Sequence, residues 1–281
     1  MRLDLGSPPG RLLPRGWEPP LRLDLRRLPV GMQLWYPDLV AGPGDVIDPL
    51  NTLTGPAPGH VFGTDQLGRD VFDRVVHGAR ASLAIGLGAT ALGAVCGIIW
   101  GLVAGLGTRW MDEGAMRVAD VFLSVPATLL ALLVVVVLGP GGPSVAIAIA
   151  IAIAPGFARI VRVHTLVARR AGYVQAATVL GVPRFHVIRR HVVPNILPPM
   201  VILATMNIGQ SIIAAASLSF LGLGATESSA EWGSMLAQSR DTLQDAWAPA
   251  VFPGLALTLT VISFSVIGRE LQARLEGRND L

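Results

Sequence analysis

The sequence has 281 residues, of which 52% are hydrophobic and 15% are charged; its mean hydropathy is +0.56 and its formal net charge is +3. Such a composition is too apolar for an ordinary soluble domain and indicates a membrane protein, and the small charge, gathered in a few loops, does not suggest a nucleic-acid partner. All 22 basic residues are arginines, so the chain can build neither a Walker A loop nor a lysine-based Schiff base.

The first 58 residues are rich in proline, glycine and arginine, and no cleavable signal peptide is recognisable among them. Their most apolar piece, residues 28–40, contains two prolines and Asp38, and it is shorter than the roughly 20 apolar residues that cross a bilayer. We therefore expect residues 1–58 to be irregular or to lie on the membrane surface, and residues 59–281 to form a transmembrane domain.

Residues 60–80 predict a short amphipathic helix at the membrane interface, just before the first span. Asp70 is expected to cap this helix and to pair with Arg74, one turn later. The first span is expected over residues 82–106, about 37 Å of helix. Glycine recurs at every fourth position from Gly93 to Gly105, which predicts close packing against another helix of the same bundle.

Four more spans are expected after the first. Pro126 interrupts the second, and the third is expected to bend near Pro155 and to leave the bilayer at Arg159. The spans are expected over residues 118–138, 144–158, 196–223 and 248–268.

Three polar side chains, those of Asn207, Gln210 and Ser217, lie near one face of the fourth span. Polar residues inside a membrane helix usually face the bundle interior or a water-filled path. These three are therefore either pathway-lining residues or hydrogen-bonding groups between helices, and the sequence leaves both readings open.

Arginines follow the first, third and fifth spans, whereas the loops after the second and fourth contain only Arg240. The positive-inside rule therefore predicts a multi-pass membrane protein with a cytoplasmic C-terminus. The six arginines among the first 27 residues conflict with an external approach to the first span, and no clear additional N-terminal span resolves the conflict.

Residues 172–195 form a polar, basic stretch between two apolar segments, and this stretch must stand in water. Its first part predicts a helix that ends at Gly181. Pro183 can then open a second short helix, which Pro194 is expected to end. Small residues in this stretch leave a surface that a partner can approach closely.

This stretch resembles the cytoplasmic "EAA" loop of importer permeases of the ATP-binding-cassette class. The usual Glu is replaced by Gln175, and the usual Leu by Val193. The resemblance implies that the loop transmits the motion of an ATPase partner. The residues it marks for this coupling are Gln175, Ala176, Ala177, Gly181, His191 and Pro194; Asn195 also matches the motif.

Three further strings are similar to C-type permease subunits of dipeptide and oligopeptide importers. They are HVFGTDQLGRDVFDRVVHGAR at 60–80, SLSFLGLG at 217–224 and EWGSML at 231–236. Asp73 and Glu231 replace serines that are usual in the family. The resemblance covers most of residues 60–278.

The resemblance implies an all-α polytopic protein with the five-helix core of a type I importer, placed in the plasma (inner) membrane of a prokaryote. It implies a permease, not an enzyme, that binds no metal or cofactor itself. ATP and Mg²⁺ belong to two partner ATPase subunits, and a B-type permease and an extracytoplasmic binding protein complete the importer. Membrane lipid surrounds the spans.

The implied cargo is a di- or oligopeptide. A nickel-chelate permease of the same superfamily is the alternative, although no cluster of metal ligands at suitable spacing favours it. An intramembrane enzyme or a proton-coupled carrier needs ionisable groups within the spans, and only Asp120, at the end of one span, is present.

Overall fold

The computed structural model describes residues 41–42, 44–224 and 229–276. Within these residues the chain is helical, and the only β contacts are isolated bridges. Four helices are long and apolar enough to cross a membrane, and there are five spans if the bent pair α3–α4 is one of them, in agreement with the five-helix core expected. The elements are α2 (Val71–Leu106), α3 (Arg109–Ser124), α4 (Ala127–Leu138), α5 (Gly142–Arg170), α6 (Gly172–Val179), α7 (Arg184–Val187), the π-helix η3 (Ile188–Val192), α8 (Val193–Phe220), α9 (Trp232–Ser239) and α10 (Ala248–Glu276).

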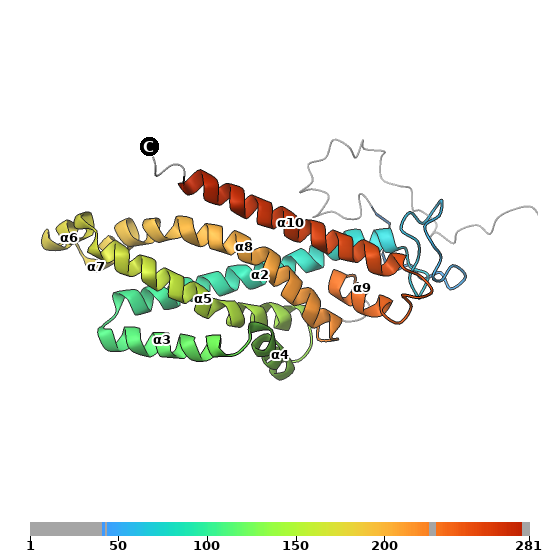
Figure 1. Cartoon of the computed structure of the whole chain (residues 1–281), viewed down its shortest axis with the longest axis horizontal. Coiled ribbons are helices and arrows are strands. Elements are labelled where there is room, and N and C mark those ends of the chain that lie inside the picture. The colour runs from blue at the N-terminus through green and yellow to red at the C-terminus, as the bar shows by residue number, and fades with distance from the viewer. Residues whose placement is uncertain (1–40, 43, 225–228, 277–281) are drawn as a thin grey trace, which may run out of the picture.

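The long helices α2, α5, α8 and α10 form the bundle, with α6 and α7 at one end and α9 at the other (Figure 1). Residues 44–70 form a series of turns at the α9 end. Buried apolar clusters join α2 to α5 and α8 along the bundle, and join the start of α2 to α9. The expectation for residues 1–40 lies outside the described residues.

The start of α2 differs from the prediction of a separate interfacial helix, because α2 is one continuous helix of 36 residues. Asp70 caps it as predicted, with its carboxylate accepting the backbone N–H groups of Phe72 and Asp73. The indole of Trp232 in α9 donates to the carbonyl oxygen of Val75 at 2.9 Å. The face that was expected to meet lipid headgroups therefore packs against α9, and no helix breaker separates it from the span.

The predicted pair between Asp70 and Arg74 is wrong. The Asp70 carboxylate lies 2.8 Å from Nδ1 of His60, while Nε of Arg74 lies 3.6 Å from the carboxylate of Asp65. Both partners belong to the segment before α2, which folds back against the start of the helix. Helical spacing alone cannot reveal such competing partners.

The glycine stripe packs α2 against α5, as predicted. A Cβ at Gly101 would lie 2.5 Å from the carbonyl oxygen of Ala158, and one at Gly105 would lie 2.7 Å from Cβ of Thr165. Only glycine permits this approach of the two backbones. The stripe is therefore an interface within the bundle.

The second span is broken near Pro126, where α3 and α4 meet at a bend of 92°. In contrast, α5 continues through Pro155 and extends twelve residues past Ala158. Arg159 and Arg162 form ion pairs with Asp120 and Asp112 of α3 respectively.

Pro194 does not end the helix that begins after Pro183, so this prediction is wrong. The segments α7, η3 and α8 form one continuous helix of 37 residues, Arg184–Phe220. A proline lacks an N–H group and crowds the carbonyl four residues earlier. The wider π-helical turn just before Pro194 accommodates this local demand.

Candidate functional site

The candidate site is the turn that joins α6 to α7. Gly181 lies at φ +76°, in the left-handed region that glycine adopts without strain. Its N–H donates to the carbonyl oxygen of Thr178, and the N–H of Val182 donates to that of Ala177, so the last carbonyls of α6 are satisfied. A Cβ at Gly181 would meet nothing within 4 Å. The backbone conformation, not crowding, therefore favours glycine here.

The α6 helix is anchored to the base of α8. Asn195 Nδ2 donates to the hydroxyl of Tyr173 at 2.7 Å and to the carbonyl oxygen of His191 at 2.6 Å. The rings of Tyr173 and His191 lie 5.8 Å apart, and Val174 is buried. These contacts therefore couple the position of α6 to the start of α8.

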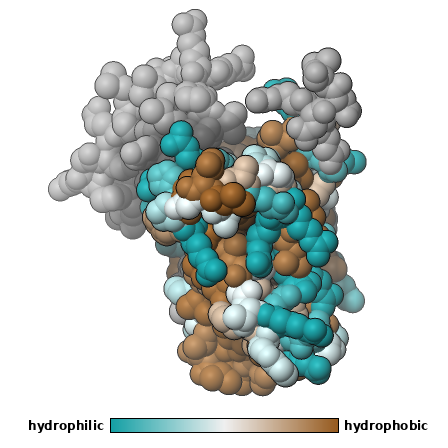
Figure 2. Space-filling model, turned by 90° about the vertical axis from the view of Figure 1, so that its left-hand side faces the viewer, coloured by the Kyte–Doolittle hydropathy of each residue, from teal (hydrophilic) through white to brown (hydrophobic). Residues whose placement is uncertain are grey.

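The outer surface of this turn is apolar. Val179, Leu180 and Phe185 are 87%, 82% and 73% exposed, although such side chains are usually buried. Exposed arginines surround them, and Figure 2, which views this end of the molecule, shows hydrophobic surface next to hydrophilic side chains. We call Val179, Leu180 and Phe185 the α6–α7 patch.

The predicted coupling residues lie beside this patch. Ala176, Gly181 and Pro194 are exposed, whereas Ala177 and His191 are half-buried. The motif did not include the three patch residues. Their signal was nonetheless present in the sequence, as large apolar residues in a segment that must face water.

Gln175 is exposed and donates to the carbonyl oxygen of Arg170 at 3.3 Å. It also lines a cavity of about 740 Å³ between the end of α2 and the α6–α7 segment. Arg169 and Arg184 line the same cavity. The carboxylate usual in the family would therefore share this cavity with two cationic side chains, and glutamine removes their attraction.

The three polar residues predicted on the fourth span, Asn207, Gln210 and Ser217, make no hydrogen bond to another helix within the described part of the chain. Asn207 Nδ2 and Ser217 Oγ each donate to a carbonyl oxygen of α8 itself, at 2.9 Å, and Gln210 is exposed. Ser217 lines an apolar cavity of about 210 Å³ between α4, α5 and α8. Within the bundle, a different residue of α8 makes a polar contact to another helix: Thr90 of α2 donates to Ser211 at 2.9 Å.

Metal ligation has no support among residues 41–42, 44–224 and 229–276, because no three His, Cys, Asp or Glu side chains there could hold an ion together. The single cysteine, Cys96, is exposed on α2.

Curated proteins similar to this chain are transport permeases. The chain is 41% identical over 229 residues to the dipeptide transport system permease protein DppC of Alkalihalophilus pseudofirmus. The alignment covers 82% of this chain and 75% of that protein. It is 42% identical over 222 residues to the glutathione transport system permease protein GsiD of Pectobacterium atrosepticum. This alignment covers 79% of this chain and 74% of the GsiD protein.

Solved structures with the same fold include the inward-facing MetNI methionine ABC transporter, with a TM-score of 0.59, 20% identity, and coverage of 71% of this chain and 95% of that chain. An amino acid ABC transporter matches with a TM-score of 0.54, 17% identity, and coverage of 74% and 94%. The family model for the inner membrane component of binding-protein-dependent transport systems matches residues 97–280, well over half of the sequence. The chain therefore belongs to the family of binding-protein-dependent transport system inner membrane components.

Proposed function

We propose that this chain forms part of the pathway for di- and oligopeptides in an ATP-driven importer, and that an ATPase subunit binds its α6–α7 patch. Its relatives over most of the chain are named for dipeptide and glutathione transport, and both of these substrates are peptides. ATP and Mg²⁺ bind the partner ATPases, because a chain without lysine has no Walker A loop. A second permease and a binding protein complete the importer.

The observation that carries the proposal is the exposed α6–α7 patch. Three large apolar side chains in water are unfavourable unless a partner covers them. The α6–α7 turn that carries the patch lies at the end of the bundle opposite α9 (Figure 1), and its polar, basic sequence places it in water. Small residues beside it, Ala176 and Gly181, allow a partner backbone to come close.

The continuous helix Arg184–Phe220 supplies the mechanical link. It begins beside the patch and is about 55 Å long, which is enough to cross the membrane. The pathway candidates Asn207, Gln210 and Ser217 lie along it. Motion of the ATPase moves α6, the Tyr173–Asn195 contact moves the base of α8, and the continuous helix carries the displacement into the bilayer.

The proposed orientation places the patch in the cytoplasm, where ATP is present, and α9 outside. It rests on the arginines at the α6–α7 end and follows the positive-inside rule. Cysteines at Arg184 and Arg240, each in a Cys96→Ala background, test this orientation. An impermeant thiol reagent should label only the Arg240→Cys protein in intact cells, and labelling of Arg184→Cys would overturn the orientation.

The experiment for the patch compares two substitutions of exposed apolar residues by glutamate. Phe185→Glu changes the patch, whereas Val46→Glu changes a 60% exposed side chain at the opposite end of the molecule. Both proteins should insert, because neither position lies in the bilayer. Only Phe185→Glu should lose co-purification with the ATPase. Equal ATPase recovery with both variants would refute the patch as the docking surface.

A further inference from the structure

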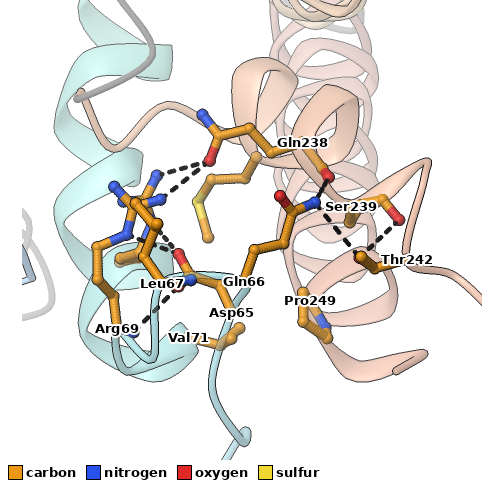
Figure 3. A pocket seen from close by; sticks show the side chains of 11 residues that line it. Asp65, Gln66, Leu67, Arg69, Val71, Gln238, Ser239, Thr242 and Pro249 are labelled. Carbon is orange, nitrogen blue, oxygen red and sulfur yellow. Dashed lines mark hydrogen bonds and ion pairs between the residues drawn. The ribbon is translucent and has the colours of Figure 1, made fainter. Parts of the chain in front are cut away.

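A cavity lies at the end of the bundle opposite α6–α7, between α9 and the segment that precedes α2 (Figure 3). Gly68 lies at φ +73°, and a Cβ there would collide with the carbonyl oxygen of Asp48, so only glycine lets this segment fold back. The fold brings Arg69 beside Arg74, which lies in the first turn of α2. Both guanidinium groups line the cavity.

The two guanidinium groups share one carboxylate. Arg69, Arg74 and Asp65 are only 6%, 1% and 8% exposed. One oxygen of Asp65 lies 2.7 Å from Nε of Arg69 and 3.6 Å from Nε of Arg74, while the other accepts the N–H groups of Leu67 and Arg69. Asp45, another acid that acts on Arg74, is exposed, so water screens it. Within the described residues, the cavity wall therefore holds one buried positive charge in excess.

One nitrogen of this pair is unsatisfied. Nη1 of Arg74 is buried and has no hydrogen-bond partner in the described part of the chain. The Nη2 atoms of Arg74 and Arg69 donate to Oε1 of Gln238 in α9 at 3.4 and 3.2 Å, and this acceptor is neutral. A buried charged donor without an acceptor costs more than a neutral one and normally meets a counter-charge. An anion in the cavity would supply the missing counter-charge beside these two Nη2 atoms.

The cavity has a volume of about 200 Å³, more than ten times what one water molecule needs. Gln66, Ser239 and Thr242 add polar groups to its wall, and Val71 and Met235 add apolar ones. Figure 3 shows Gln66 reaching from one side of the cavity toward Ser239 and Thr242 on the other. A small group with one negative charge and a few carbon atoms fits this lining.

We propose that this cavity, the Arg69–Arg74 site, binds a carboxylate, and that its occupant is the C-terminal carboxylate of the peptide cargo. One excess positive charge matches a monovalent carboxylate better than a divalent phosphate. The planar guanidinium fork presents paired donors that suit two carboxylate oxygens. The inference rests on the proposed function, since peptides arrive at this end of the molecule, where a buried charge attracts them.

The test uses the assembled permease–ATPase complex in nanodiscs, without the binding protein. Labelled dialanine is the probe, and dialanine amide, which lacks the carboxylate, is the competitor. Dialanine should bind at least about tenfold more tightly than the amide, the difference expected for one hydrogen bond to a charged group. Arg74→Gln should weaken dialanine binding by a similar factor. Arg240→Gln, which removes an exposed arginine at the same end but outside the cavity, should not.

Loss of binding by Arg74→Gln would also follow from misfolding, so Thr242→Asp provides a second test. It leaves both arginines in place and adds a carboxylate to the cavity. This variant should abolish dialanine binding and raise the melting temperature, whereas Thr242→Asn should do neither. Equal binding of dialanine and its amide, or normal binding by Thr242→Asp, would overturn the site. Normal dialanine binding by Arg74→Gln with weaker docking of the binding protein would show that an acidic side chain of that protein is the occupant, and would refute the cargo assignment.

The same complex, supplied with binding protein and ATP, separates this inference from the proposed function. Peptide uptake without carboxylate-selective binding would refute the Arg69–Arg74 site and leave the importer intact. Failure of the wild-type complex to take up any peptide would refute the proposed function itself.

Discussion

Replacing Gly101 by alanine is expected to destabilise the packing of α2 on α5. The new Cβ would lie 2.5 Å from the carbonyl oxygen of Ala158 and 2.6 Å from Cβ of Val161. These distances are shorter than van der Waals contact, and the first involves backbone, so α5 must shift as a unit. Overpacking of this kind typically costs about 1–3 kcal/mol.

Gly88→Ala is the matched control on the same helix. Both substitutions gain up to about 1 kcal/mol of helix propensity. A Cβ at Gly88, however, would meet nothing within 4 Å. The difference between the two variants therefore isolates the contact with α5, about 1–3 kcal/mol. At roughly 2–4 °C per kcal/mol, Gly101→Ala should melt roughly 2–12 °C below Gly88→Ala.

Size-exclusion chromatography after a heat step measures this difference in detergent. Heating rates must be identical for both proteins, because unfolding of a membrane protein is often irreversible and its midpoint then depends on rate. Equal midpoints would refute the close approach of α2 and α5. So would a higher midpoint for Gly101→Ala.

Substitutions at four other positions test separate parts of the account. Gly181→Asn should keep ATPase co-purification and peptide uptake, since asparagine tolerates a φ of +76°, whereas Gly181→Val should lose both; equal behaviour would refute the conformational argument. Gln175→Glu should be tolerated or strengthen ATPase recovery, because it faces Arg169 and Arg184; a strong loss on pull-down would contradict this. Asn207→Leu should leave assembly intact and alter uptake, because Asn207 bonds only to its own helix in the described part of the chain; loss of the complex on gel filtration would show a packing role instead. Burial raises the pKa of Glu231 above its ordinary value of 4.5, so the folded protein binds this proton more tightly than the unfolded chain does. The stability that this group contributes therefore falls as the pH rises through the folded pKa. Glu231→Gln should flatten the profile of melting temperature against pH above 4.5, and an unchanged profile would refute the raised pKa of Glu231.

Features of the fold that depend on neighbouring residues were predictable from the sequence. Asp70 caps α2 because a carboxylate can reach two free N–H groups of the first turn. Pro126 breaks the second span, and the four-residue repeat of glycine marks the face of α2 that meets α5. Each of these signals is complete within one turn or one helix face.

Features that depend on distant residues were not predictable. The partner of Arg74 is Asp65, and the face around Val75 is covered by Trp232, because separate segments fold onto the start of α2. Pro194 predicted the end of a helix, but the helix continues through it because the π-helical turn before it makes room for the proline ring. Proline in a helix is tolerated where the turn before it can widen, and the sequence does not state this.

The candidate site was predictable in part. The motif located the turn, and α6 ends just before Gly181, as the break in the pattern predicted. The exposed Leu180 and Phe185 were missed because the motif residues drew the prediction to small side chains. The charge excess at Arg69 and Arg74 required coordinates, since spacing alone cannot show that one carboxylate serves two guanidinium groups.

ATP-dependent uptake of labelled dialanine into proteoliposomes tests the central claim most directly. The vesicles contain this chain, its partner permease and the ATPases, and binding protein is added outside. Uptake should require ATP and should disappear with Phe185→Glu, while the variant protein remains in the membrane and Val46→Glu retains ATPase recovery. ATP-driven uptake at the wild-type rate with Phe185→Glu would contradict the claim that the α6–α7 patch couples the ATPase to the pathway.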